Sequence, residues 1–156
     1  MFLNKAQNLS NLSKHKIENT KIPNFFFFNI LYCFIKKEAI INNIISRLGD
    51  KICVRSSYFK EDSSKSSLAG KFDSFIKIKK NKRNICKAVN SLIVQYKNFS
   101  KNKSSFLKNN ILVQDFVQNS ICSGVITNYN LSDGAPYYTI NYNDITSSTL
   151  SVTSGD

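Results

Sequence analysis

Apolar residues recur at every third or fourth position in three segments of the chain, residues 5–13, 37–48 and 84–96. This spacing places them on one face of a helix, because an α-helix turns once in roughly 3.6 residues. Gly49 follows the second segment and is typical of a helix end. We therefore predict three amphipathic helices. Their apolar positions are Ala6, Leu9 and Leu12; Ile40, Ile41, Ile44, Ile45 and Leu48; and Ile85, Val89, Leu92, Ile93 and Tyr96.

Short apolar or alternating runs lie between and after these helices, and they predict strands. The strand segments are residues 25–30, 51–56, 71–78, 111–117, 122–128 and 137–142. Asp133–Gly134 is a turn signal between the last two segments, which predicts that they form a hairpin. The polar segments 57–69 and 99–110 are predicted as a loop and a connector. Mixed helices and strands in this order favour an α+β fold.

The most hydrophobic run of the chain is residues 25–35. It is shorter than the about 20 residues that a membrane-spanning helix needs, so we interpret it as a buried strand and expect no membrane association. The N-terminus has no apolar signal core followed by a small-residue cleavage site. The four cysteines are far apart, and with the single His15, expected on the surface, they do not match a zinc site. Reduced thiols in a cytoplasmic protein are the simplest interpretation.

The chain carries a formal net charge of +12 over 156 residues. A basic balance of this size raises nucleic acid as a partner. However, 19 of the 22 basic residues are lysines, and Lys, Asn and Ile share A/T-rich codons. The phenylalanines also cluster in apolar runs, which suits a core better than a base-stacking surface. We therefore expect no specific nucleic-acid partner. A salt-sensitive gel shift would identify the chain as a nucleic-acid binder.

The most informative stretch begins where an apolar run ends in Arg55-Ser56-Ser57. A Ser-rich polar loop follows, and Ala69-Gly70 then lead into the 71–78 strand, in which Phe72, Ser74, Ile76 and Ile78 alternate with their neighbours. This is strand, polar loop and strand, with a fixed cation at the loop entrance. Arg supplies planar, permanently charged donors, and Gly lets backbone N–H groups approach oxygens closely. Such a layout suits a nucleotide polyphosphate.

The same stretch resembles the ATP-binding domain of the pyruvate phosphate dikinase and phosphoenolpyruvate synthase family, an ATP-grasp fold. Val54 to Asp62 follows the family pattern V-R-S-S-x-x-x-E-D, and Ala69 to Phe75 follows A-G-x-x-D-T-[FY], with Ser74 keeping the hydroxyl of the usual Thr. Further ordered similarities cover nearly the whole chain. They are Lys5 to Leu12 (G-G-K-A-x-N-L-x-x-L), Ile22-Pro23 (V-P-P-G-F), Val113 to Val117 (V-Q-x-M-V) and Ser123-Gly124-Val125 (S-G-V-A-F). The chain departs from the family in having Leu3-Asn4 in place of the two glycines and Pro23-Asn24 in place of Pro-Pro-Gly.

The resemblance implies a set of site residues. Lys5 and Arg55 would contact the ATP phosphates, with Gly70 and Ser74 near them. Gln114, Asp115, Phe116 and Val117 would form the hinge whose backbone pairs with adenine. A triphosphate carries several negative charges and needs cations from different elements, together with Mg²⁺, to hold it. No metal ligands are expected within this chain itself.

The resemblance also implies a role. We expect residues 1–156 to form one partial ATP-grasp-like domain with a mixed sheet and flanking helices, serving an ATP-dependent phosphotransferase. A separate chain or downstream domain would carry the phosphohistidine and the pyruvate site, since the downstream acid and Q-x-R motif of the family do not occur here. The chain would then be a piece of a split enzyme, a shortened relative or a remnant. The alternative is a non-catalytic nucleotide-binding module, and the phosphoryl acceptor stays open.

Overall fold

The computed structural model describes residues 3–59, 62–63, 66–67, 70–130 and 132–144. The chain divides into two compact units, Met1–Phe116 and Val117–Asp156. The first unit contains, in order, α1 (Lys5–Leu12), β1 (Phe25–Asn29), α2 (Ile30–Arg47), β2 (Lys51–Ser57), β3 (Asp62–Ser63), β4 (Ser66–Ser67), β5 (Ser74–Lys79), α3 (Lys82–Phe99), α4 (Lys103–Leu107) and β6 (Asn110–Asp115). The second contains β7 (Ser123–Thr127) and β8 (Thr139–Asn143).

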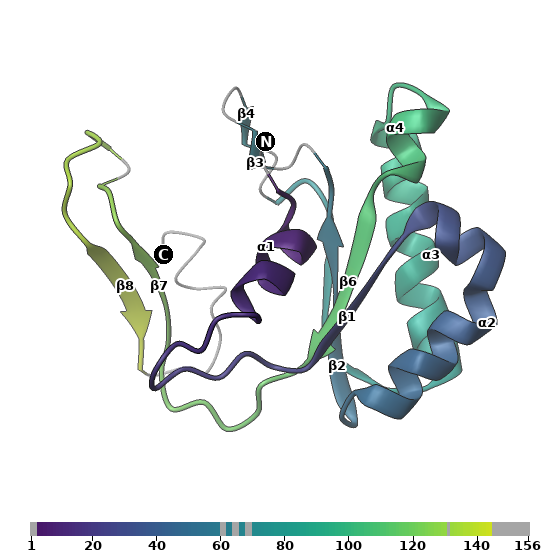
Figure 1. Cartoon of the computed structure of the whole chain (residues 1–156), viewed down its shortest axis with the longest axis horizontal. Helices are drawn as coiled ribbons and strands as arrows, with labels where there is room; N and C mark the ends of the chain where they lie inside the picture. The colour runs from purple at the N-terminus through teal and green to yellow at the C-terminus, as the bar shows by residue number, and fades with distance from the viewer. Residues whose placement is uncertain (1–2, 60–61, 64–65, 68–69, 131, 145–156) are drawn as a thin grey trace. The chain divides into compact units, whose positions relative to one another are not determined.

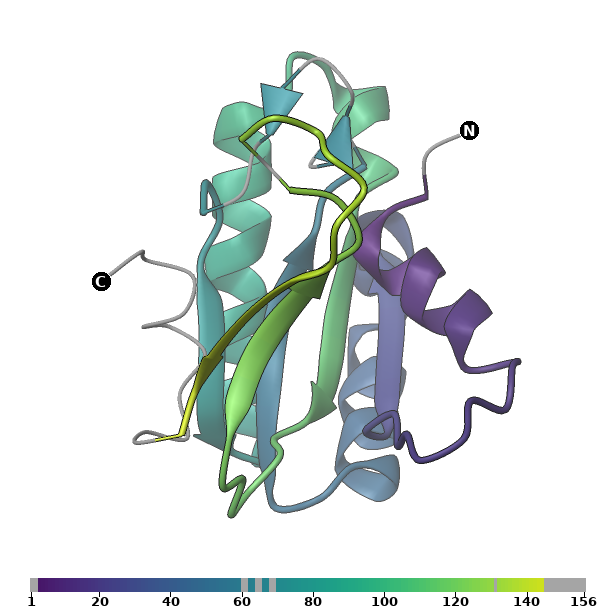
Figure 2. The ribbon, with the colours of Figure 1, turned by 90° about the vertical axis from the view of Figure 1, so that its left-hand side faces the viewer.

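A four-stranded sheet forms the centre of the first unit, with the strand order β1-β6-β2-β5. The helices α2 and α3 lie on one face of this sheet, and α1 lies on the other (Figures 1 and 2). The α+β class predicted from the sequence is confirmed. We expected a mixed sheet, but every strand pairing among the described residues is antiparallel.

The hydrophobic core lies between the sheet and the helices α2 and α3. Alternate residues of the strands point into it, as the two-residue period of a strand requires. Its members include Ile40, Ile41, Ile44 and Leu48 of α2, Ile85, Val89 and Leu92 of α3, and Ile52, Val54, Ile111 and Val113 of the sheet. The apolar faces predicted for the second and third helices are therefore the buried ones. Ile45 is the exception, with 38% of its surface exposed.

The interpretation of residues 25–35 as one buried strand is wrong in its second half. The strand ends at Asn29, whose side-chain oxygen accepts a hydrogen bond from the Tyr32 amide at 2.7 Å and caps α2. An Asn cap of this kind satisfies an amide that the first helical turn leaves without a partner, so the chain turns into a helix. Leu31, Phe34 and Ile35 are consequently exposed on α2. Lys36 (φ −130°, ψ 38°) kinks the helix just before residue 37, where the sequence predicted it to begin.

Two other helices also begin at asparagines, in segments that the sequence predicted as a turn and a connector. Asn81 caps α3 through the Asn84 amide, and Asn102 caps α4 through the Ser105 amide. The connector predicted for residues 99–110 therefore contains the short helix α4. Like Asn29, both caps accept from the amide three residues onward, which is the local geometry that favours Asn at a helix start.

Aromatic side chains hold the two ends of the 57–69 loop together, although much of that loop lies outside the described residues. Tyr58 lies at the start of the loop and Phe72 follows its end, and their ring centroids are 5.0 Å apart. Both rings contact Tyr96 of α3, at 5.5 and 5.0 Å between centroids, and both contact Phe99 as well. Such tilted and edge-to-face pairs are favourable beyond their buried area. The loop thus leaves and re-enters the fold at one point on α3.

The second unit is the hairpin that the sequence predicted. The strands β7 and β8 pair antiparallel, with Ser123 opposite Asn143 and Thr127 opposite Thr139. Gly134 adopts φ +72° in the connecting turn, a conformation that favours glycine. Gly124 is required for another reason, because a Cβ there would lie 2.6 Å from the Asn141 carbonyl oxygen. Among the residues that the structure describes, no helix is long and apolar enough to cross a membrane.

The fold generates a prediction about Tyr96. Its buried hydroxyl accepts from the Ser57 amide at 2.7 Å and donates to the Asn110 carbonyl at 2.9 Å, so it joins α3 to β2 and β6. Tyr96→Phe keeps the ring but leaves both backbone groups without this partner. We expect it to lower the free energy of unfolding by about 1–3 kcal/mol, measured by urea denaturation. The control Tyr32→Phe, on a residue that is 47% exposed, should change little. Equal stability of Tyr96→Phe and wild type would contradict this role.

Candidate functional site

Arg55 and Ser74 lie side by side on the sheet face opposite α2 and α3. Arg55 pairs with Ser74 of β5 on one side and with Leu112 of β6 on the other, and Leu112 in turn pairs with Phe27 of β1. Directly paired residues of antiparallel strands share a face, so these four form one row across the sheet. Arg55 and Ser74 are exposed, whereas Leu112 is buried at 3% exposure. The open part of the face is therefore its β2–β5 side.

A bulge in β5 makes this register possible. The pairing between β2 and β5 shifts between Ile52 and Val54, and Lys77 of β5 has φ +55°. As a result, Phe75 and Ile78 both pack against the core although they are three residues apart. The strict alternation expected from Phe72 to Ile78 does not hold, because a bulge inserts one extra residue on one strand. Ser74 still faces outward beside Arg55.

Ser57 attaches α1 to the same face. It lies two residues beyond Arg55 on β2, so its side chain points to the Arg55 side of the sheet. Its Oγ accepts a hydrogen bond from the Ala6 amide at 2.9 Å and donates one to Asn4 Oδ1 at 3.0 Å, and the residue is fully buried. Lys5 stands between these two bonded residues. The second serine of the Arg-Ser-Ser stretch is thus a positioning residue for Lys5.

The first turn of α1 uses up its own backbone donors. Asn4 Oδ1 accepts from the Gln7 amide at 3.0 Å, and Gln7 Oε1 accepts from the Asn4 amide at 3.1 Å, a reciprocal capping box. The Ala6 amide is bonded to Ser57. A ligand at this end of the helix would therefore meet the Lys5 side chain rather than these amides. A hollow of about 610 Å³ is lined by residues of α1, from Lys5 to Leu12, and by His15. His15 is exposed, as the sequence predicted.

Arg55 has no ion-pair partner in the described part of the chain. An ion pair among the described residues joins Lys82 to Glu38, on the helix side of the sheet. A guanidinium that is exposed on a sheet face, without a carboxylate beside it, is ready to meet an external anion. Cys53 lies two residues away on the same face and is buried, and its burial raises the pKa of its thiol, an effect that the Lys77 backbone amide and the charge of Arg55 partly offset.

Gly70 stands where the polar loop returns to the fold. It has φ +78° and is exposed, with open space where a Cβ would lie. Just after it, the Asp73 amide donates to Gln95 Oε1 at 2.9 Å, and Gln95 Nε2 donates to Asp73 Oδ2 at 2.7 Å. These bonds fix the start of β5 on α3. The left-handed backbone at Gly70 allows the sharp approach to β5 that precedes Ser74.

The four residues expected to hold adenine are divided by the structure. Gln114 pairs with Cys53 and so shares the face of Arg55. Asp115 pairs with Ile52 and faces the helix side, where its carboxylate accepts from the Gly49 amide at 2.7 Å and from Asn24 Nδ2 at 2.8 Å. The Phe116 amide donates to the Lys51 carbonyl at 3.0 Å. Val117 begins the second unit and is exposed.

Sequence reasoning missed the residues that position this site, namely Ser57, Asn4 and Tyr96. A signal existed for Asn4, because Asn followed three residues later by Gln is a capping-box pattern. None existed for Ser57, whose partners are 51 and 53 residues away along the chain. Among the described residues, no three His, Cys, Asp or Glu side chains gather as metal ligands would.

The role of Ser57 can be tested by hydrogen exchange. Ser57→Ala removes the acceptor of the buried Ala6 amide, which should lower the local opening free energy of α1 by about 1–3 kcal/mol. The amides of α1 should then exchange roughly tenfold faster or more, while those of α3 keep their wild-type rates. Ser74→Ala, an exposed serine on the same face, is the matched control and should leave α1 unchanged. Unaltered α1 exchange in Ser57→Ala would refute the attachment.

Thiol reactivity gives a second test of the sheet face. Burial raises the pKa of the Cys33 and Cys53 thiols, so at a given pH below that value less of each is the reactive thiolate. Cys122 is exposed. We expect iodoacetamide to modify Cys122 first, and the two buried cysteines roughly tenfold more slowly or less, as followed by mass spectrometry. Modification of Cys53 as fast as Cys122 would show that this face is open down to β2.

The chain matches a known protein family. The family described as pyruvate phosphate dikinase, AMP/ATP-binding domain, matches residues 4–144, which run through both units. The class of protein is therefore a nucleotide-binding α+β domain of the ATP-grasp type. The chain belongs to the pyruvate phosphate dikinase AMP/ATP-binding domain family, which confirms the resemblance seen in the sequence. No curated protein and no solved structure matches the chain.

Proposed function

We propose that this chain binds ATP on the sheet face defined by Arg55, with the phosphates contacted by Lys5 and Arg55. The observation that supports this is the bond between Ser57 and the first turn of α1. It brings a lysine of α1 to the same face as Arg55 of β2, which has no ion-pair partner among the described residues. Lys5 and Arg55 are 50 positions apart in the sequence, and a polyphosphate is a ligand that two cations on one face can share.

The spacing fits a polyphosphate. Ser57 lies two residues from Arg55, which is about 7 Å along a strand. Lys5 lies in the chain between Asn4 and Ala6, the two residues that form hydrogen bonds with Ser57. Lys and Arg side chains are long, so two cations that start this close can contact neighbouring phosphate groups of one molecule. Ser74, directly opposite Arg55, would add a hydroxyl, and Gly70 would let the loop approach the phosphates.

The base would lie toward Gln114. Cys53 and Gln114 form the next row on the same face, and Phe25 pairs with Gln114 on the far side. Gln114 is half-buried beside the stacked rings of Phe25 and Phe27. Apolar walls with a few polar groups at one edge are typical of adenine sites. The Asp115 carboxylate is bonded to Gly49 and Asn24, and the Asp115 and Phe116 amides donate to the Asn24 and Lys51 carbonyls. Any hinge contact of Asp115 and Phe116 with the base would therefore use their backbone carbonyls.

The reaction we propose is phosphoryl transfer as part of a pyruvate phosphate dikinase-like or phosphoenolpyruvate synthase-like enzyme. Mg²⁺ would neutralise phosphate charge, and it commonly does so through phosphate oxygens and waters with only one or two carboxylates. Within this chain, Lys5 and Arg55 would hold the phosphates in line. A separate chain or a further domain would supply the histidine that receives the phosphoryl group.

Isothermal titration with ATP and Mg²⁺ tests the proposal. Arg55→Ala removes a charge-assisted contact worth about 1.5–3 kcal/mol, so we expect affinity to fall about tenfold to a hundredfold. Arg83→Ala is the matched control, since it removes the same charge from an exposed residue on α3, the helix that covers the other face. It should bind ATP nearly as wild type does.

Two results would count against the site. If Arg55→Ala and Arg83→Ala lose affinity equally, ATP responds only to the overall positive charge. If neither loses affinity, the nucleotide binds elsewhere. Adding salt to the wild-type titration separates the first case further, because screening weakens a general charge effect most strongly.

A further inference from the structure

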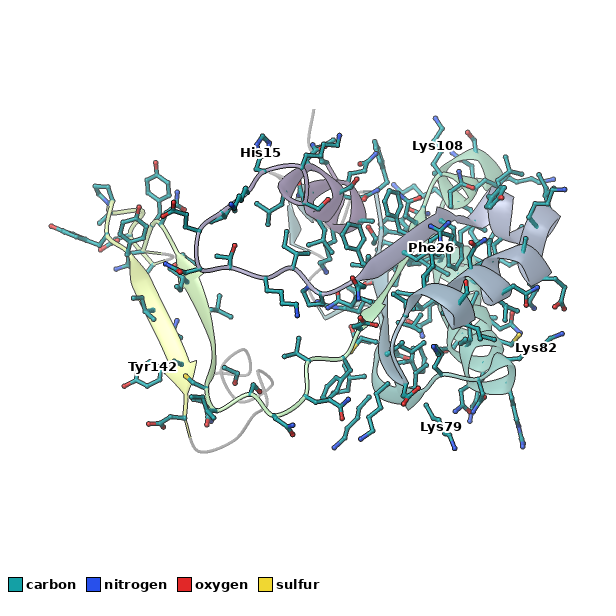
Figure 3. All side chains as sticks on the ribbon, turned by 60° about the horizontal axis from the view of Figure 1, so that its bottom comes forward. His15, Phe26, Lys79, Lys82, Lys108 and Tyr142 are labelled. Atoms are coloured by element: carbon teal, nitrogen blue, oxygen red, sulfur yellow. The ribbon has the colours of Figure 1, made fainter. Side chains whose placement is uncertain are left out.

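A second cavity lies at the edge of the first unit, away from Arg55. It has a volume of about 520 Å³ and is lined by the segment between α1 and β1 and by the end of α2. His15, one of the lining residues, lies beyond the end of α1 (Figure 3). A volume of this size is in the range of small-molecule sites. No role for this cavity follows from the nucleotide face.

The walls of the cavity combine positive charge with apolar surface. His15 and Lys16 come from the segment after α1, and Arg47 comes from the last turn of α2. The apolar part is formed by Ile17, Ile22, Pro23, Phe25 and Leu48. No Asp or Glu is among the lining residues in the described part of the chain. The cavity therefore favours an anion that also carries an apolar portion.

The neutral polar groups of the wall already donate to the protein. Ser13 Oγ donates to the Ser10 carbonyl at 2.8 Å, and Thr20 Oγ1 donates to the Ile17 carbonyl at 2.8 Å. Asn24 Nδ2 donates to Asp115 at 2.8 Å. The hydroxyl protons of Ser13 and Thr20 are thus used, and the cationic donors of the wall are those of Lys16 and Arg47. Arg47 is held in place, with its guanidinium 5.7 Å from the centre of the Phe26 ring.

The cavity is separate from the proposed phosphate site. Phe25 belongs to the edge strand β1, whereas Arg55 belongs to β2, with β6 between them. Two strand spacings amount to roughly 10 Å. Neither Arg55 nor Ser74 lines the cavity.

We propose that this cavity binds a small organic anion, a phosphate or carboxylate group attached to a planar apolar ring. The anionic group contacts Lys16 and Arg47, with His15 beside them. The ring lies against Ile22, Pro23 and Phe25. Charge alone or a ring alone would use only half of the wall, so the two parts together bind more tightly than either part by itself.

Phenyl phosphate is a suitable probe, and its binding to the full 156-residue chain can be followed by amide chemical shifts. We expect the shifts to map to residues 13–25 and 47–48, and phenyl phosphate to bind more tightly than inorganic phosphate or benzyl alcohol. Lys16→Met should weaken binding about fivefold, the effect of roughly 1 kcal/mol. Lys16 is exposed, so the variant should fold normally.

Lys14→Met is the matched control, because Lys14 is exposed in the same segment but does not line the cavity. It should bind the probe as wild type does, and Arg55→Ala should also bind the probe as wild type does, because Arg55 does not line the cavity. Equal weakening by the two lysine variants would overturn the proposal in favour of general charge attraction. Weakening by Arg55→Ala would overturn it by assigning the probe to the nucleotide face.

Discussion

The first unit depends on the hydrogen bonds that meet at Ser57. Its amide donates to the Tyr96 hydroxyl on the helix side, and its Oγ bonds the Ala6 amide and Asn4 on the other side. One residue at the end of β2 thus joins α3, the sheet and α1. A buried polar group of this kind is costly if any partner is lost, because the remaining groups stay desolvated. The position of α1, and with it Lys5, follows from that constraint.

The same residue explains how the Arg-Ser-Ser stretch is divided between the two faces of the sheet. Successive side chains of a strand alternate between faces, so Arg55 and Ser57 share a face while Ser56 points into the helix side. Arg55 is exposed, and both serines are buried. The stretch therefore combines an exposed cation, Arg55, with Ser57, which attaches the helix that carries Lys5. The stretch also leads into the polar loop. The rings of Tyr58 and Phe72, at the two ends of that loop, pack against Tyr96 of α3.

Periodicity predicted the helices well, because α2 and α3 each place a continuous apolar stripe against the sheet. It failed where a single local interaction outweighed it. At Asn29 a cap changes strand to helix inside one apolar run, and at Lys77 a bulge breaks the alternation of β5. Asparagine is abundant in this chain, and its abundance masked the positions where it caps helices, including Asn81 and Asn102. The candidate site residues came from motif resemblance, whereas the placement of Arg55, Ser74 and Gln114 on one face depends on long-range strand pairings that no local pattern contains.

Asp115 shows how one strand serves both the fold and the proposed site. Its carboxylate accepts hydrogen bonds from Gly49, in the turn after α2, and from Asn24, just before β1. It thus holds these two segments together at one end of the sheet. Gln114, one residue earlier, points to the opposite face beside Phe25 and Cys53. Because adjacent strand residues face opposite ways, a rigid structural contact on one side fixes the position of a ligand contact on the other. Because the bonds of Asp115 fix this end of β6, the Gln114 side chain has a defined position on the opposite face, as the proposed recognition of a planar base requires.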